Sequence, residues 1–106
     1  MKRLLVCLLL VGVVGCSSDA NKAIKEYNKG VSFADREDWA TAITHFNEAI
    51  RLDPNYARAY HNRGAVYRSK SEPDKAIADY TEAIRIDPNY ASAYNNRGLV
   101  YAGLAQ

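Results

Sequence analysis

The sequence repeats itself after 34 residues, and this repeat limits the possible folds more than any other feature. The tetrapeptide Asp-Pro-Asn-Tyr at 53–56 recurs at 87–90, and Glu-Ala-Ile-Arg at 48–51 recurs at 82–85. Chains that repeat with a period of this size build stacked supersecondary units that share a continuous core. The chain therefore divides into a first unit at 23–56, a second at 57–90 and a partial third at 91–106.

Each unit has the spacing of helices. In the second unit, aromatic, apolar and small residues recur at steps of three and four over 60–67 and again over 76–84. Gly30, Gly64 and Gly98 occupy the same place in the three units. A glycine inside a helix costs about 1 kcal/mol relative to alanine. We therefore expect these glycines to offset that cost by letting a neighbouring helix approach closely.

Prolines and an aspartate predict where the helices begin and end. Proline suits the first turn of a helix, so Pro73 should begin the second helix of its unit. Asp38 is the matching N-cap in the first unit. Pro54 and Pro88 should end the second helices, because the residue before a proline avoids the helical region. The sequence thus predicts two helix–turn–helix units and one further helix over about 91–104.

This pattern resembles the tetratricopeptide repeat over residues 23–106. That family has a skeleton of an aromatic, a Leu-Gly pair, Tyr, Ala, an aromatic and Pro at a period of 34. The resemblance implies an all-α superhelix of about two and a half helical hairpins. The residues that carry it are Gly30, Phe33, Ala42, Phe46, Ala49 and Pro54 in the first unit, Tyr60, Gly64, Tyr67, Ala76, Tyr80, Ala83 and Pro88 in the second, and Tyr94, Gly98 and Tyr101 in the third.

The chain departs from the family at a few positions. Lys29, Arg63 and Arg97 stand where the family usually has leucine, and Glu26 replaces the first aromatic with Tyr27 beside it. Long cationic side chains can cover apolar surface with their stems while the charge stays in water. We expect that role for the three cations, and a less regular first hairpin.

The resemblance also implies a concave face, lined by the first helix of each hairpin, that holds a peptide or helix of a partner protein. Its positions in this chain are Tyr27, Val31, Ala34, His61, Ala65, Arg68, Asn95, Leu99 and Ala102. Asn28, Asn62 and Asn96 recur beside it, and an amide both donates and accepts hydrogen bonds. These asparagines either grip a peptide main chain or bond neighbouring turns and water, and Arg68 either meets an acidic partner or is solvated. The predicted protein-binding residues are Tyr27, Asn28, His61, Asn62, Arg68, Asn95 and Asn96.

Two specialised chemistries are not expected. Some family members hold a C-terminal carboxylate with a Lys-Asn pair followed by Lys and Arg, but Tyr27 and Val31 occupy the first pair's places. Neither His45 nor His61 has a second metal ligand at zinc spacing. There is no H-E-x-x-H motif or glycine-rich phosphate loop, and carboxylates such as those of Asp79 and Glu82 fit a solvated helix face. We expect no enzyme activity, cofactor or metal.

The N-terminal residues indicate an export signal. Residues 1–15 have a basic head, an uncharged apolar run and a small-residue end, which is the order of a secretory signal. The run is shorter than the roughly 20 residues that span a bilayer; a buried core helix is the alternative. The segment Val-Val-Gly-Cys at 13–16 resembles the bacterial lipobox. This resemblance implies cleavage before Cys16, acylation of Cys16 and a tether at 16–22, whereas the alternative is a plain signal with a structural Cys16.

Net charge, the cysteine count and Ser17 limit the partners, the disulfides and the location that we expect. Removing Lys2 and Arg3 leaves 12 Lys and Arg against 12 Asp and Glu, so nucleic acid is a poor partner for the neutral mature chain. Cys7 would leave with the signal, which excludes an internal disulfide. Ser17 implies the periplasmic side of the outer membrane if the source is Gram-negative.

The predicted function is a lipid-anchored scaffold or adaptor for protein–protein interactions at the bacterial cell envelope, with the membrane bound through Cys16. The alternative is a self-associating structural lipoprotein without a peptide ligand. Leu99, Val100 and Leu104 could form an exposed apolar patch on the last helix. That helix is a sufficient cap, or it pairs with a second copy in a homodimer, or the sequence is a truncated product.

Overall fold

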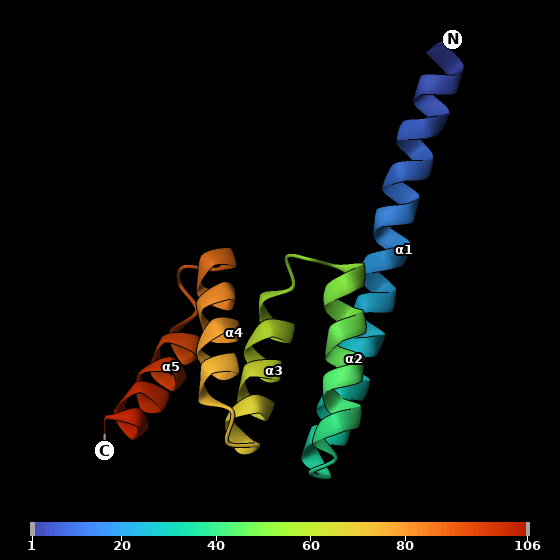
Figure 1. The fold of residues 1–106 in the computed structure, drawn as a ribbon. Coiled ribbons are helices and arrows are strands. Elements are labelled where there is room, and N and C mark those ends of the chain that lie inside the picture. The colour runs from blue at the N-terminus through green and yellow to red at the C-terminus, as the bar shows by residue number, and fades with distance from the viewer. Residues whose placement is uncertain (1, 106) are drawn as a thin grey trace.

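The computed structural model describes the backbone of residues 2–105 and the side chains of residues 18–105. Its elements are α-helices arranged side by side as antiparallel neighbours (Figure 1). Over the described residues there is no strand, which confirms the all-α prediction. The helices are α1 (Lys2–Asp35), α2 (Trp39–Leu52), α3 (Ala57–Ser69), α4 (Pro73–Ile86) and α5 (Ala91–Leu104).

Helix α1 is far longer than the others and projects beyond them (Figure 1). It includes residues 16–22, the predicted tether, as a continuous helix. No proline or glycine interrupts this segment, so each added residue gains a helical hydrogen bond. The side chains of 18–22 are exposed, and those of the predicted signal at 1–15 and of Cys16 lie outside the described residues. Within the described part of the chain, no helix combines the length and apolar character needed to cross a membrane.

The predicted helix boundaries are confirmed. Pro73 is the first residue of α4, and the carboxylate of Asp38 accepts a hydrogen bond from the Thr41 amide at 3.4 Å at the start of α2. Asp53 and Asp87, each followed by proline, leave the helical region at the ends of α2 and α4. The 34-residue repeat in the sequence therefore becomes a repeat of helix starts and stops.

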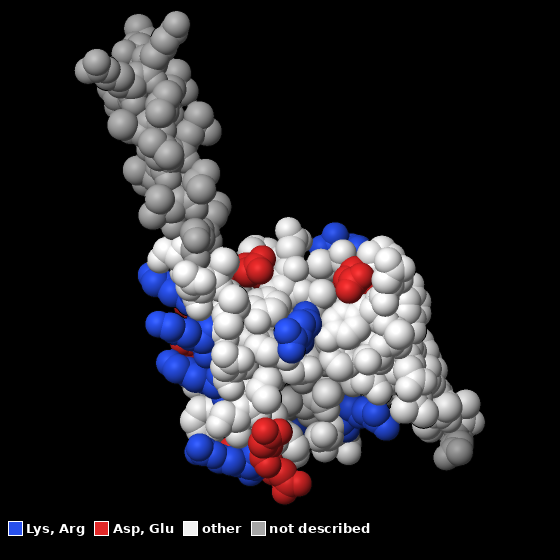
Figure 2. Space-filling model, turned by 180° about the vertical axis from the view of Figure 1, so that it is seen from behind, with Lys and Arg blue, Asp and Glu red and all other residues white. Residues whose placement is uncertain are grey.

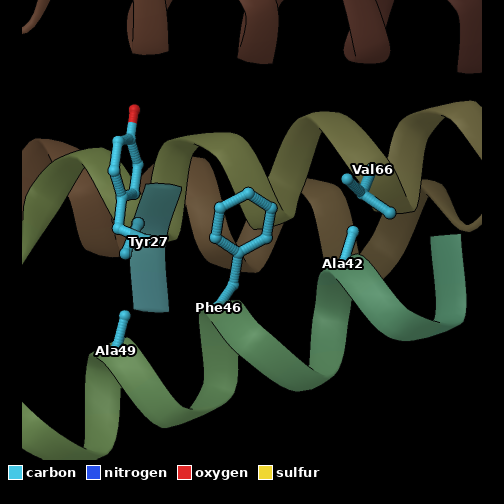
Figure 3. Packing of buried hydrophobic residues seen from close by; sticks show 6 residues of the cluster. Tyr27, Ala42, Phe46, Ala49 and Val66 are labelled. Carbon is cyan, nitrogen blue, oxygen red and sulfur yellow. The ribbon is translucent and has the colours of Figure 1, made fainter. Parts of the chain in front are cut away.

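The cores of the two hairpins follow one plan. Ala42, Phe46 and Ala49 project from the same side of α2 toward Tyr27 and Val66 (Figure 3). Phe46 is fully buried between the two alanines. In α4, Tyr80 lies fully buried between Ala76 and Ala83 in the same register. One large ring between small residues thus fills the space between paired helices.

The glycines confirm the expected close approach at two of three positions. A Cβ built on Gly30 would lie 2.6 Å from Cε1 of Phe46, and one on Gly64 would lie 3.1 Å from Cε1 of Tyr80. A Cβ on Gly98 would meet nothing within 4 Å. The prediction of close packing is therefore wrong for Gly98, because no second helix covers α5 within the described residues.

Candidate protein-binding groove

Two hollows lie along the first helices of the hairpins. The first has a volume of about 230 Å³ and is lined by Val31, Ala34 and Ala65 among others. The second has a volume of about 410 Å³ and is lined by Arg68 and Leu99 among others. These five residues are positions of the concave face predicted from the sequence, so the structure places them at hollows that a ligand could enter.

The two hollows are one feature repeated after 34 residues. Each lies between the hairpin turn of one unit and the first helix of the next. Equivalent residues line both of them: Ala34 and Arg68, Trp39 and Pro73, Ala65 and Leu99, Val66 and Val100, and Ser69 and Gly103. A ligand that crosses both hollows would therefore meet the same positions of the repeat twice, with valine at one of them in both hollows and different side chains at the others. The sequence prediction named positions on the first helices only, so it did not include Trp39 and Pro73. Both are the first residue of a second helix, and this shared position could have indicated them.

The walls are mainly apolar, and each hollow has one charged residue. Asp35 lines the first hollow, and Arg68 lines the second. Both side chains are exposed, so water solvates them in the absence of a ligand. The groove thus offers apolar contact along its length, with a negative charge in one hollow and a positive charge in the other.

Four of the predicted binding residues instead bond one another. The Asn62 amide donates to the Tyr27 hydroxyl at 2.8 Å, and the Asn96 amide lies 2.9 Å from Nε2 of His61. His61 Nδ1 lies 3.0 Å from Oδ1 of Asn62. Because the Asn96 amide can only donate through Nδ2, Nε2 must accept, and Nδ1–H donates to Asn62. Asn62 and Asn96 therefore make contacts between α1, α3 and α5, and Asn62 also lines the first hollow.

Tyr27 is a core residue, not part of the groove wall. It is 7% exposed, and its ring lies 5.0 Å from the ring of Tyr56 and 5.9 Å from that of Phe46. The Arg58 guanidinium lies 5.2 Å from the ring centroid. The rings of α2 and of the turn after it enclose Tyr27, so little of its surface is open to a partner, and its role in binding stays a prediction. Of the remaining predicted residues, Asn28, Arg68 and Asn95 are exposed.

The structure explains the departure at Glu26. Its carboxylate lies 2.7 Å from Nδ1 of His45 on α2, where the family usually places an aromatic contact. The His45 ring stacks on Phe33 at 5.3 Å with an interplanar angle of 4°. The hydrogen bond from His45 lowers the pKa of Glu26. A polar contact between α1 and α2 thus replaces the aromatic one.

The prediction that the charge of Arg63 stays in water is wrong. Its guanidinium donates to both carboxylate oxygens of Asp79 at 2.7 and 2.8 Å and to Asn47 at 2.8 Å. Asp79 is only 5% exposed, so its prediction as part of a solvated face is also wrong. Glu82, by contrast, bonds Arg85 near the surface of α4. Arg63 ties α3 to both α4 and α2.

The comparison with protein families identifies the fold. The sequence matches the TPR repeat family over residues 30–71 and again over 64–104. These two overlapping matches span most of the helical array. The chain belongs to the tetratricopeptide repeat family. A search of the curated proteins found no significant match.

Several solved structures have the same fold as this tetratricopeptide array. A structure described as MamA is 37% identical, with a TM-score of 0.78 over 79% of this chain and 49% of the other. The Arabidopsis OM64 TPR domain is 28% identical, with a TM-score of 0.79 over 82% and 72% of the two chains. The TPR2B domain of yeast Sti1, in complex with pHsp70, is 31% identical, with a TM-score of 0.76 over 78% of this chain and 66% of the other. The chain spans about half the length of MamA.

His61 should make stability depend on pH. Burial lowers its pKa, and the rings of Tyr80 and Tyr90, at 5.6 and 4.9 Å, provide no negative charge beside it. The unfolded histidine titrates near pH 6.5, so below that pH the unfolded chain holds a proton that the folded chain resists. The contribution of His61 is therefore complete above about pH 6.5 and is lost as the pH falls through its folded pKa.

Urea unfolding at several pH values measures this effect. Position 95, the equivalent of position 61 in the third unit, is asparagine, so His61→Asn uses a residue that the repeat already has there. We expect this variant to lose less free energy of unfolding than the wild type as the pH falls below about 6.5. Protonation of Nε2 would also oppose the Asn96 amide donor, so the wild-type loss should include weaker docking of α5. An identical pH dependence in the variant and the wild type would contradict the role given to His61.

Proposed function

We propose that this tetratricopeptide protein is a scaffold that binds a segment of a partner protein across the two hollows of its concave face. The observation that carries the proposal is the repeat of the hollow itself. A hollow built from equivalent positions of a hairpin turn and the next first helix occurs twice at a spacing of 34 residues. A partner segment with two apolar anchors could use both hollows at once.

The chemistry of the hollows favours an apolar segment with opposite charges at its two ends. A basic residue would suit Asp35 in the first hollow, and an acidic residue would suit Arg68 in the second. A structurally similar TPR domain of Spaghetti (RPAP3) is described as bound to an HSP90 peptide, SRMEEVD. In the present chain Tyr27 is buried and Val31 is apolar at the places of the first clamp pair, so an acidic C-terminal tail is not the expected ligand.

Site-specific photo-crosslinking tests the groove. A photoreactive residue at Ala65, which lines the first hollow, should give a discrete adduct with a partner in cells. The matched control is the same residue at Ala78, which is exposed on α4 and does not line either hollow. The Leu99→Glu substitution in the second hollow should remove the adduct if one segment crosses both. The same adducts from both positions, unaffected by Leu99→Glu, would contradict the proposal.

The exposed Leu99 and Leu104 favour self-association as a second candidate function. A dimer that buries these leucines would close the second hollow to a peptide. The molar mass in solution distinguishes the two functions, because an open groove predicts a monomer whose mass does not change with concentration. A stable dimer that Leu99→Glu dissociates would favour the structural lipoprotein.

We further propose that acyl chains on Cys16 hold the scaffold at the bacterial cell envelope, on the periplasmic side of the outer membrane in a Gram-negative source. The support is the lipobox-like segment at 13–16 and the exposed side chains of 18–22, which allow an enzyme or a membrane to reach this part of the chain. Each buried methylene of an acyl chain contributes about 0.8 kcal/mol of membrane affinity.

Metabolic labelling with an alkyne fatty acid tests the anchor. Cys16→Ser should abolish labelling and move the protein from the membrane fraction to the soluble fraction. Cys7→Ser is the matched control and should keep both the label and the membrane association, because Cys7 belongs to the segment removed by cleavage. A Cys16→Ser protein that stays at the membrane would exclude the lipid anchor without affecting the groove.

A further inference from the structure

Within residues 18–105, one row of α5 is not covered by a helix, whereas the same row is covered in both other units. In α3 this row consists of Ala57, Tyr60, Gly64 and Tyr67, with α4 packed against it. The equivalent row of α5 is Ala91, Tyr94, Gly98 and Tyr101. Tyr94 is 45% exposed and Tyr101 is 52% exposed. Nothing within the described residues lies close to a Cβ on Gly98.

The second unit shows which side chains complete such a row. On α4, Ala76, Asp79, Tyr80 and Ala83 are all buried. The Tyr80 ring lies against Gly64, and the Asp79 carboxylate accepts two hydrogen bonds from the Arg63 guanidinium. The covering face therefore has the pattern Ala-x-x-Asp-Tyr-x-x-Ala, in which a carboxylate precedes an aromatic residue between two small ones.

Arg97 makes one of the three hydrogen bonds that Arg63 makes. The Nη1 of Arg63 bonds Asn47 on the preceding hairpin, and the Nη1 of Arg97 bonds Thr81 in the equivalent place. The Nε and Nη2 of Arg63 bind the Asp79 carboxylate. Over residues 18–105, no carboxylate forms an ion pair with Arg97. Its guanidinium is already held over Tyr94 at 5.5 Å, so it is oriented for an acidic group.

The charges argue against a second copy of the chain as the occupant. Helix α5 has Arg97 as its one charged residue, and the face of the molecule toward its C-terminal end is largely white in the view of Figure 2. Pairing of α5 with α5 of a second copy would bring two Arg97 side chains together without a carboxylate. The matching faces of α2 and α4 are buried in their own hairpins, so they are not accessible to α5 of a second copy.

We propose that the open row of α5 binds an amphipathic helix of a partner protein with the pattern of α4, in which a carboxylate pairs with Arg97 and the next aromatic residue lies over Gly98. This site lies beside the groove but does not use its hollows. The scaffold would then have two kinds of ligand, one across the concave face and one helix on the open row of α5. The proposal does not depend on peptide binding in the groove.

A peptide with the sequence of residues 72–87 is the probe, because it carries the α4 face and the residues that cap it. It is added to the full chain, and the amide chemical shifts of α5 are followed by NMR. Isolated helices of this length are marginal in water, so the peptide is used at millimolar concentration. The expected result is saturable shifts centred on Tyr94, Gly98 and Tyr101.

Gly98→Leu fills the row and should weaken the peptide at least tenfold. Ser92→Leu is the matched control on the same helix; Ser92 is exposed, lies outside the row and lines neither hollow, so this change should leave binding unchanged. The peptide with Asp79→Asn should bind the wild-type chain about tenfold more weakly than the unchanged peptide does. The two peptides should bind the Arg97→Gln chain with nearly equal affinity, because either change removes the same ion pair.

Other results would overturn the proposal. Binding that Gly98→Leu does not weaken would mean that the peptide exchanges with α4 inside the second hairpin. An absence of α5 shifts at millimolar peptide would mean that the row does not accept such a helix. A concentration-dependent dimer that Gly98→Leu dissociates would mean that a second copy covers the row.

Discussion

Replacing Arg63 by alanine should lower the free energy of unfolding by about 3–5 kcal/mol, because it leaves the buried carboxylate of Asp79 without its partner. The side chain of Arg63 is 19% exposed and that of Asp79 is 7% exposed, so the pair is largely shielded from water. The same substitution also removes the hydrogen bond to Asn47. Urea unfolding followed by helical circular dichroism measures the change.

Arg97→Ala is the matched control for this prediction. Arg97 has the same place in the repeat but bonds only the Thr81 hydroxyl, at 3.2 Å, so its loss should cost about 1 kcal/mol or less. The double substitution Arg63→Met with Asp79→Ala should be more stable than Arg63→Ala alone, because it leaves no unpaired buried charge. If Arg63→Ala and Arg97→Ala lower the free energy of unfolding equally, the ion pair between Arg63 and Asp79 contributes no extra stability.

The sequence predicts the helices well because their boundaries depend on local chemistry. Proline, an N-cap aspartate and a 34-residue period act within a few residues of one another, and α2, α4 and α5 begin and end where these signals place them. Helix α1 is different, because no proline or glycine marks a start near residue 23. Without such a signal, the helix continues backward through the predicted tether.

The site was less predictable because its contacts join residues far apart in the chain. Asn62 meets Tyr27 and Asn96 meets His61 across 35 residues, and no local pattern shows whether an exposed-looking amide will bond a neighbouring helix. One signal was available for Asp79. It follows Ala76 and precedes Tyr80 and Ala83 on the buried face of an amphipathic helix, and a carboxylate in that position needs a cation such as Arg63.

The same side chain at equivalent glycines should have opposite effects on stability in the first and third units. Gly30→Ala would place a Cβ 2.6 Å from Cε1 of Phe46, whose ring is fully buried and has no free space to move into. Overpacking of this kind costs about 1–3 kcal/mol and exceeds the gain in helix propensity. Gly98→Ala meets nothing, so it should raise the free energy of unfolding by up to about 1 kcal/mol.

Thermal and urea unfolding of the three single variants test this ranking. Gly64→Ala should fall between the other two, because its Cβ would lie 3.1 Å from the Tyr80 ring and a small shift of that ring can relieve the contact. Phe46→Leu should restore part of the stability of Gly30→Ala, since a smaller side chain makes room for the added methyl group, although alone it leaves a cavity and destabilises. If Gly30→Ala is as stable as Gly98→Ala, the first hairpin is not closed by the contact between Gly30 and Phe46, and the open row of α5 would no longer be the exception among the three units.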